Sequence, residues 1–180
     1  MATHSSLPSQ QVGNGRLTLR EAIIYALLGA LLVAVQVSLA FLPNIEIVSL
    51  LIIGYTITMG ARVLFPIAVF VLLQGLIYGF GLWFLNYTYV WAVLVFLALL
   101  FRRRMQSPLA WAVLSGAYGL FFGALCSIPY FFIGGPASAL AYWLSGIPFD
   151  VLHCAGNFLM AMLLLKPVLR MLKAGFAMLQ

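Results

Sequence analysis

Long uncharged apolar stretches, separated by short connections, constrain this chain more than any other feature of its sequence. The 180 residues include nine Lys and Arg and only three Asp and Glu, whereas 65% belong to the apolar set AVILMFWYC. Soluble domains are typically about 45–50% apolar and roughly 25% charged, so a soluble enzyme and a disordered chain are both excluded. The sequence therefore predicts an all-α membrane protein.

Six stretches have the composition and approximate length of helices that cross a bilayer. Thr18 and Glu21 are spaced as a capping box at the start of the first, and Pro43 ends it. The sequence Gly134-Gly135-Pro136 ends the fifth. The predicted transmembrane helices are 21–42, 46–61, 63–83, 87–101, 109–133 and 147–165, with a short interfacial helix at 137–145.

The basic residues fall on one side of this arrangement. If six helices alternate in direction, all nine Lys and Arg lie before the first, after the sixth, or in the second and fourth connections. The positive-inside rule makes this side cytoplasmic, so both termini are expected in the cytoplasm. The net charge of +6 then indicates orientation, and no nucleic-acid partner is expected. The expected domains are a disordered tail at 1–17, a six-helix transmembrane domain at 18–173 and a tail at 174–180.

The rare polar residues concentrate at the opposite ends of the helices. Glu46 follows the first external turn, and Asp150, His153 and Asn157 lie within about 60° of one another on one face of the last helix. Ionisable groups in a membrane usually face a cavity or one another. Two explanations stay open, a polar ligand pocket or a structural hydrogen-bond network in which Asp150 and His153 cap the helix end.

Aromatic residues gather beside these polar groups. Five aromatic rings surround Asn86 between Trp83 and Trp91, and they form either an interfacial belt or the wall of a binding site. Gln36 and Gln74 either line the floor of such a site or hydrogen-bond between helices. The candidate substrate-binding residues are Asn44, Glu46, Asn86, Tyr87, Tyr89, Trp91, Trp143, Asp150, His153 and Asn157.

Motifs for catalysis are absent from the sequence. It has no phosphate-binding GxxxxGK[ST], no HExxH and no GxSxG motif. We therefore expect no catalytic residue, no bound metal and no cofactor.

Four features together resemble a known family. They are the short six-helix chain, alanines at every fourth position of the first helix (Ala22, Ala26, Ala30), Pro43-Asn44-Ile45-Glu46 entering the second helix, and GIPFDVLH at 146–153 followed by Gly156-Asn157-Phe158. The chain is similar to the substrate-binding S component of energy-coupling factor (ECF) vitamin transporters. The resemblance covers about residues 18–170.

The resemblance implies a subunit without chemistry of its own in the plasma membrane of a prokaryote. It would capture a vitamin or related micronutrient at the outer face and deliver it inward with a membrane coupling subunit and two ABC ATPases. Ala22, Ala26 and Ala30 would contact the coupling subunit. The few charges and many rings predict a largely uncharged, flat or bulky ligand, such as a cobalamin-type or other heteroaromatic vitamin.

Two alternatives remain beside this hypothesis. One is an intramembrane enzyme that uses His153 as a base and Asp150 to orient it. The other is a structural assembly protein whose polar cluster only fixes helix packing.

Overall fold

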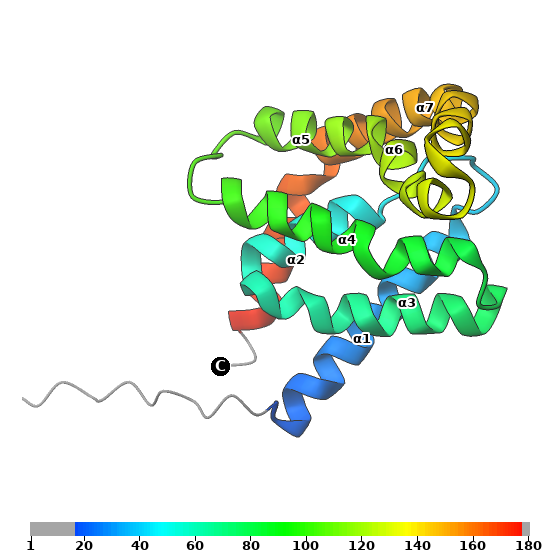
Figure 1. Ribbon diagram of the computed structural model, residues 1–180. Coiled ribbons are helices and arrows are strands. Elements are labelled where there is room, and N and C mark those ends of the chain that lie inside the picture. The colour runs from blue at the N-terminus through cyan, green and yellow to red at the C-terminus, as the bar shows by residue number, and fades with distance from the viewer. Residues whose placement is uncertain (1–16, 178–180) are drawn as a thin grey trace, which may run out of the picture.

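The computed structural model describes residues 17–177, which form helices joined by short connections, with no strand in this range (Figure 1). Four helical segments, 19–38, 48–78, 82–101 and 128–177, are long and apolar enough to cross a membrane, as expected of a multi-pass membrane protein. The elements are α1 Leu19–Ser38, α2 Val48–Met59, the 3₁₀ helix η1 Gly60–Val63, α3 Leu64–Tyr78, α4 Leu82–Phe101, α5 Pro108–Leu120, α6 Phe122–Cys126 and α7 Ile128–Ala177.

The predicted capping box at the start of α1 is confirmed. The Glu21 amide donates to Thr18 Oγ1 at 3.2 Å, and the Thr18 amide donates to Glu21 Oε2 at 2.9 Å. The helix ends at Ser38, before the predicted residue 42, and the chain then forms a series of turns to Ile47. Of the tail predicted at 1–17, only Leu17 lies within the described residues.

The predicted separation of the second and third helices is also present, but the third helix is shorter than expected. η1 separates α2 from α3, and α3 ends at Tyr78 instead of residue 83. The reason is Gly79, whose φ of 82° lies in the left-handed region that residues with a side chain rarely adopt. As a result α4 begins at Leu82, earlier than the predicted residue 87.

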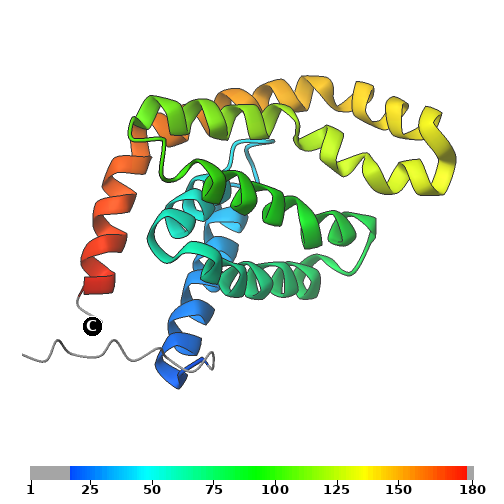
Figure 2. The same ribbon diagram turned by 60° about the vertical axis from the view of Figure 1, so that its left-hand side comes forward.

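The last part of the chain forms a helical hairpin. The predicted helix 109–133 is divided into α5, α6 and the first turns of α7, and the chain reverses at Gly135, where φ is 77° (Figure 2). Pro136 is well placed to restart the helix, because a first-turn residue needs no amide donor. Helix α7 then continues through Pro148 to Ala177, so 137–145 is not a separate helix and residues 174–177 are helical. Residues 178–180 of the predicted tail lie outside the described range.

Helix α2 forms the centre of the packing. Every residue from Val48 to Thr56 is buried, and α2 packs against α1, α4 and α7. Val168 and Leu172, in the C-terminal part of α7, lie against Gly54 of α2. Large apolar side chains are exposed on the outer surface: Leu76 is 71%, Phe132 79% and Leu163 69% exposed. Such a surface suits contact with lipid.

Candidate ligand pocket

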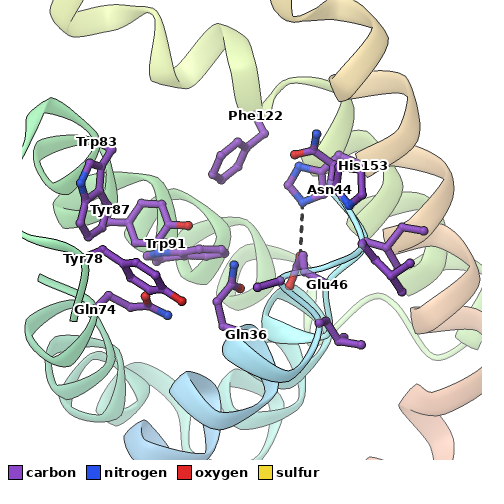
Figure 3. Close-up of a pocket in the computed structure, with 15 residues that line it drawn as sticks. Gln36, Asn44, Glu46, Gln74, Tyr78, Trp83, Tyr87, Trp91, Phe122 and His153 are labelled. Carbon is purple, nitrogen blue, oxygen red and sulfur yellow. Dashed lines mark hydrogen bonds and ion pairs between the residues drawn. The ribbon is translucent and has the colours of Figure 1, made fainter.

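A cavity of about 450 Å³ lies where the end of α1, the connection to α2, the end of α3, the start of α4, α6 and α7 meet (Figure 3). Its volume is within the range of small-molecule sites. The lining residues are Gln36, Leu39, Ala40, Leu42, Pro43, Asn44, Ile45, Glu46, Gln74, Tyr78, Trp83, Tyr87, Trp91, Phe122 and His153.

The structure brings half of the candidate residues predicted from sequence to this cavity. Asn44, Glu46, Tyr87, Trp91 and His153 line it, and so do both glutamines, Gln36 and Gln74. The other five candidates are not among the lining residues: Asn86, Tyr89, Trp143, Asp150 and Asn157. Sequence reasoning did not list Tyr78, Trp83 or Phe122 as candidates, although Trp83 belongs to the aromatic cluster it identified.

A buried contact between Glu46 and His153 forms one side of the pocket. His153 Nε2 lies 3.3 Å from Glu46 Oε1, and the Ser49 amide donates to Glu46 Oε2 at 2.8 Å. Because a carboxylate can only accept, His153 Nε2 carries the hydrogen in this contact. Both contacts bring hydrogen-bond donors to the two oxygens of Glu46, and donors at a carboxyl group favour its carboxylate form.

The backbone around this contact explains how its two side chains meet. Asn44 adopts a left-handed conformation with φ 56°, which asparagine tolerates better than most residues, and the chain then turns into α2 with Glu46 buried. Gly156 of α7 packs beside the backbone of Asn44 and Ile45. A Cβ at Gly119 would lie 2.8 Å from the carbonyl oxygen of His153, so only glycine allows α5 to approach α7 this closely. These contacts fix His153 opposite Glu46.

Aromatic rings form the other side of the pocket. Trp83, Tyr87 and Trp91 follow one another at four-residue intervals along α4, so they share one face of the helix. Their successive ring centroids are 5.3 and 5.4 Å apart, with nearly perpendicular planes. Phe122 connects this row to His153, because its ring lies 5.8 Å from that of Trp91 and 4.9 Å from the imidazole. The result is a mostly apolar wall with few polar groups.

Three buried polar atoms of the lining residues have no hydrogen-bond partner in the described structure. They are Gln74 Nε2, Trp91 Nε1 and His153 Nδ1. Native proteins leave few buried polar atoms unpaired, and each such atom costs about 1–3 kcal/mol. Unpaired polar atoms in the lining of a cavity are therefore candidates for contact with a bound molecule.

Several predicted candidates have structural partners instead. Asp150 Oδ1 accepts a hydrogen bond from the Gly123 amide at 2.9 Å, near the start of α6. Asn157 Nδ2 donates to the Ser115 carbonyl at 3.4 Å. Tyr89 donates to the Leu125 carbonyl at 2.7 Å and lies 3.0 Å from Asn86 Oδ1. Trp143 is half-buried on the α7 hairpin. These contacts fit the network explanation for Asp150 and Asn157.

Basic side chains gather at the opposite ends of the same helices. Arg62, between α2 and α3, forms an ion pair with Glu21 near the start of α1, with an N–O distance of 2.6 Å. The guanidinium of Arg102, at the end of α4, lies beside Gly60. The first four helices therefore each have one end near this basic cluster and the other near the pocket.

Within residues 17–177, no three His, Cys, Asp or Glu side chains converge in a way that could hold a metal ion. Comparison of the chain with protein-family models, curated proteins and solved structures finds no match. The expected relation to the S components therefore stays a prediction from the sequence features given above.

The Asp150–Gly123 contact predicts a structural effect of a substitution outside the pocket. Asp150→Ala removes the acceptor for the Gly123 amide, and we expect a loss of about 1 kcal/mol of stability, as for other helix caps. The measurement is the midpoint temperature, at which heating in detergent has removed half of the monodisperse protein. Val151→Ala, at an exposed neighbouring position, is the control and should retain the midpoint. Equal midpoints for both variants would contradict this role.

Proposed function

We propose that this chain is the substrate-capture S component of an ECF-type ABC importer, which binds a vitamin or related micronutrient at the outer face of the membrane. The observation that carries the proposal is the position of the pocket. It is an aromatic cavity with few polar groups, formed at the helix ends that lie opposite the basic cluster. A capture subunit needs such a cavity at the outer face.

The proposed topology has six crossings with both termini in the cytoplasm. Each of the first four segments connects the basic cluster with the pocket, and successive segments run in opposite directions: Glu21 to Gln36, Glu46 to Gly60, Arg62 to Tyr78, and Trp83 to Arg102. The chain approaches the pocket again at Phe122 and leaves it at His153, before Lys166 and the other basic residues of α7. The short helices α2 and α3 are accommodated if the bilayer thins locally.

The pocket also favours one of the expected ligand types. A cavity of about 450 Å³ suits a ligand of ordinary drug size. A cobalamin-type ligand is much larger and would leave most of its structure outside. The volume therefore supports a smaller heteroaromatic vitamin.

The hydrogen bonds of the pocket do not include the Asp150–His153 pair of the enzyme hypothesis. The enzyme hypothesis needs Asp150 to orient His153 as a base. Instead, His153 contacts Glu46, and Asp150 accepts from the Gly123 amide. Asp150 is therefore not the residue that orients His153.

The outer face of α1 supports the proposed assembly with a coupling subunit and two ABC ATPases, in the plasma membrane of a prokaryote. Ala22, Ala26 and Ala30 are all exposed, whereas Gly29 faces α3, where a Cβ would lie 2.7 Å from the Pro66 carbonyl. A stripe of small side chains lets another helix approach closely. The three alanines are thus free to contact the coupling subunit, and the ABC ATPases would hydrolyse ATP.

A bound small molecule tests the capture function. We expect the chain, purified in mild detergent from its native host, to release a small molecule that mass spectrometry detects. Tyr78→Ala should lose this molecule, because Tyr78 lines the pocket. We choose this position because its side chain is 54% exposed, so its truncation should leave the fold intact. The control is Phe132→Ala, which removes an equally large ring from a 79% exposed position outside the pocket. No released molecule from the unaltered chain, or equal retention by both variants, would contradict the proposal.

A bulky side chain on the alanine stripe tests the assembly. Ala26→Trp fills the path of an approaching helix, so we expect the ATPase subunits to be lost from the affinity-purified complex while the released small molecule is retained. Leu163→Trp adds a similar ring at an exposed site on α7 and should leave the complex intact. Retention of the ATPases by Ala26→Trp would rule out this interface.

A further inference from the structure

Within the described residues, the pocket lining contains no basic side chain that is free to pair with an anion. Within residues 17–177, its lining includes Glu46 and His153 but no Lys or Arg, although basic residues exceed acidic ones threefold in the whole chain. The Glu46 carboxylate faces the cavity beside the imidazole (Figure 3). The His153 imidazole is already in contact with Glu46, so an anionic ligand would meet a buried carboxylate and find no guanidinium or ammonium to bind it. Such burial of an unpaired charge is strongly unfavourable.

The opposite wall offers hydrogen-bond donors without partners. Trp91 is 2% exposed and Gln74 is 2% exposed, and both Trp91 Nε1 and Gln74 Nε2 are unpaired. Both residues lie on the same side of the pocket as Tyr78 and Tyr87 (Figure 3). Since an indole N–H and an amide N–H can only donate, a ligand that satisfies them must present acceptor atoms.

The rings determine the shape of the group that fits between these two sides. Aromatic side chains favour a second aromatic ring in a stacked or edge-to-face arrangement, and they also attract cations at their faces. A positively charged ring would gain in addition from the nearby Glu46 carboxylate. A nitrogen-containing ring combines a flat surface with acceptor atoms.

We propose that the pocket binds a planar nitrogen heteroaromatic ring without negative charge, whose acceptor atoms receive hydrogen bonds from Trp91 Nε1 and Gln74 Nε2, and that Glu46 excludes carboxylate and phosphate ligands. This inference rests on the proposed function, because it names the chemical class of that function's ligand. It assigns charge selection to Glu46 and ring recognition to the α4 wall.

Three pyridine probes of nearly equal shape test the charge rule. They are pyridine-3-carboxylate (anionic), pyridine-3-carboxamide (neutral) and 1-methylpyridinium-3-carboxamide (cationic). Each probe is titrated into the full chain in nanodiscs, after removal of any bound ligand from the protein, and binding is measured by saturation-transfer NMR. We expect the neutral and cationic rings to bind at least about tenfold more tightly than the carboxylate, because two like charges a few ångströms apart repel strongly in a partly buried site. Equal or tighter binding of the carboxylate overturns the inference, and so does the absence of binding by all three.

Two variants test the assigned residues. Glu46→Gln keeps an acceptor for the Ser49 amide but removes the charge, so it should reduce the difference between carboxamide and carboxylate to about twofold or less. Trp91→Phe keeps a ring and removes the N–H, and we expect about a fivefold loss of carboxamide affinity. Trp143→Phe, outside the pocket lining, is its control and should bind as the unaltered chain does. If Glu46→Gln does not fold, the three probes and the comparison of Trp91→Phe with Trp143→Phe still test the inferred ligand class.

Failure of this inference is distinguishable from failure of the proposed function. A chain that releases a carboxylate or phosphate compound from its native host remains a capture subunit, but it contradicts the ligand class. A chain that releases no small molecule contradicts the capture function itself. Release of a neutral or cationic nitrogen heterocycle supports both.

Discussion

The contact between Glu46 and His153 is the interaction on which the pocket depends. It joins residues 107 positions apart in the sequence, and it attaches the connection between α1 and α2 to the middle of α7. A buried ionisable group is tolerated only with a partner, and removal of one partner from such a pair typically costs about 3–5 kcal/mol. The turn at Asn44 and the close approach at Gly119 serve this contact, because each fixes one of its two sides. The aromatic row of α4 then closes the cavity against it.

The second constraint is the separation of charge along the helices. Glu21, Arg62 and Arg102 lie at one end of the first four helices, and the pocket lies at the other. In the proposed topology Lys and Arg lie on the cytoplasmic side, so the sorted charges would orient the pocket toward the outside. A capture subunit requires this orientation, because its ligand arrives from one side and its ATPases act from the other. Within residues 17–177, the same sorting leaves no Lys or Arg in the pocket lining, which is the basis for the proposed charge selection.

The parts of the fold that depend on local chemistry were predictable from the sequence. The Thr18 capping box and the reversal at Gly134-Gly135-Pro136 follow from side-chain hydrogen bonding and from glycine φ values. The helix ends after Ser38 and Tyr78 were not predicted, because apolar residues continue beyond them and hydropathy alone gives no boundary there. At the site, helical periodicity placed Asp150 and His153 on one face. It could not show that Asp150 accepts a hydrogen bond from the Gly123 amide and does not line the pocket. Tyr78 and Phe122 reach the pocket only through the packing of α3 and α6, which no local pattern encodes.

The central claim is that the pocket opens to the outside while the basic ends face the cytoplasm, and cysteine labelling of intact spheroplasts tests it most directly. Ala40→Cys places a thiol at an exposed position of the pocket lining, and Gln106→Cys places one at an exposed position near Arg102, in a chain whose Cys126 and Cys154 are replaced by serine. A membrane-impermeant maleimide should label the thiol at position 40 in intact spheroplasts and the thiol at position 106 only after lysis. Labelling in the reverse order, or of both positions before lysis, would contradict the account.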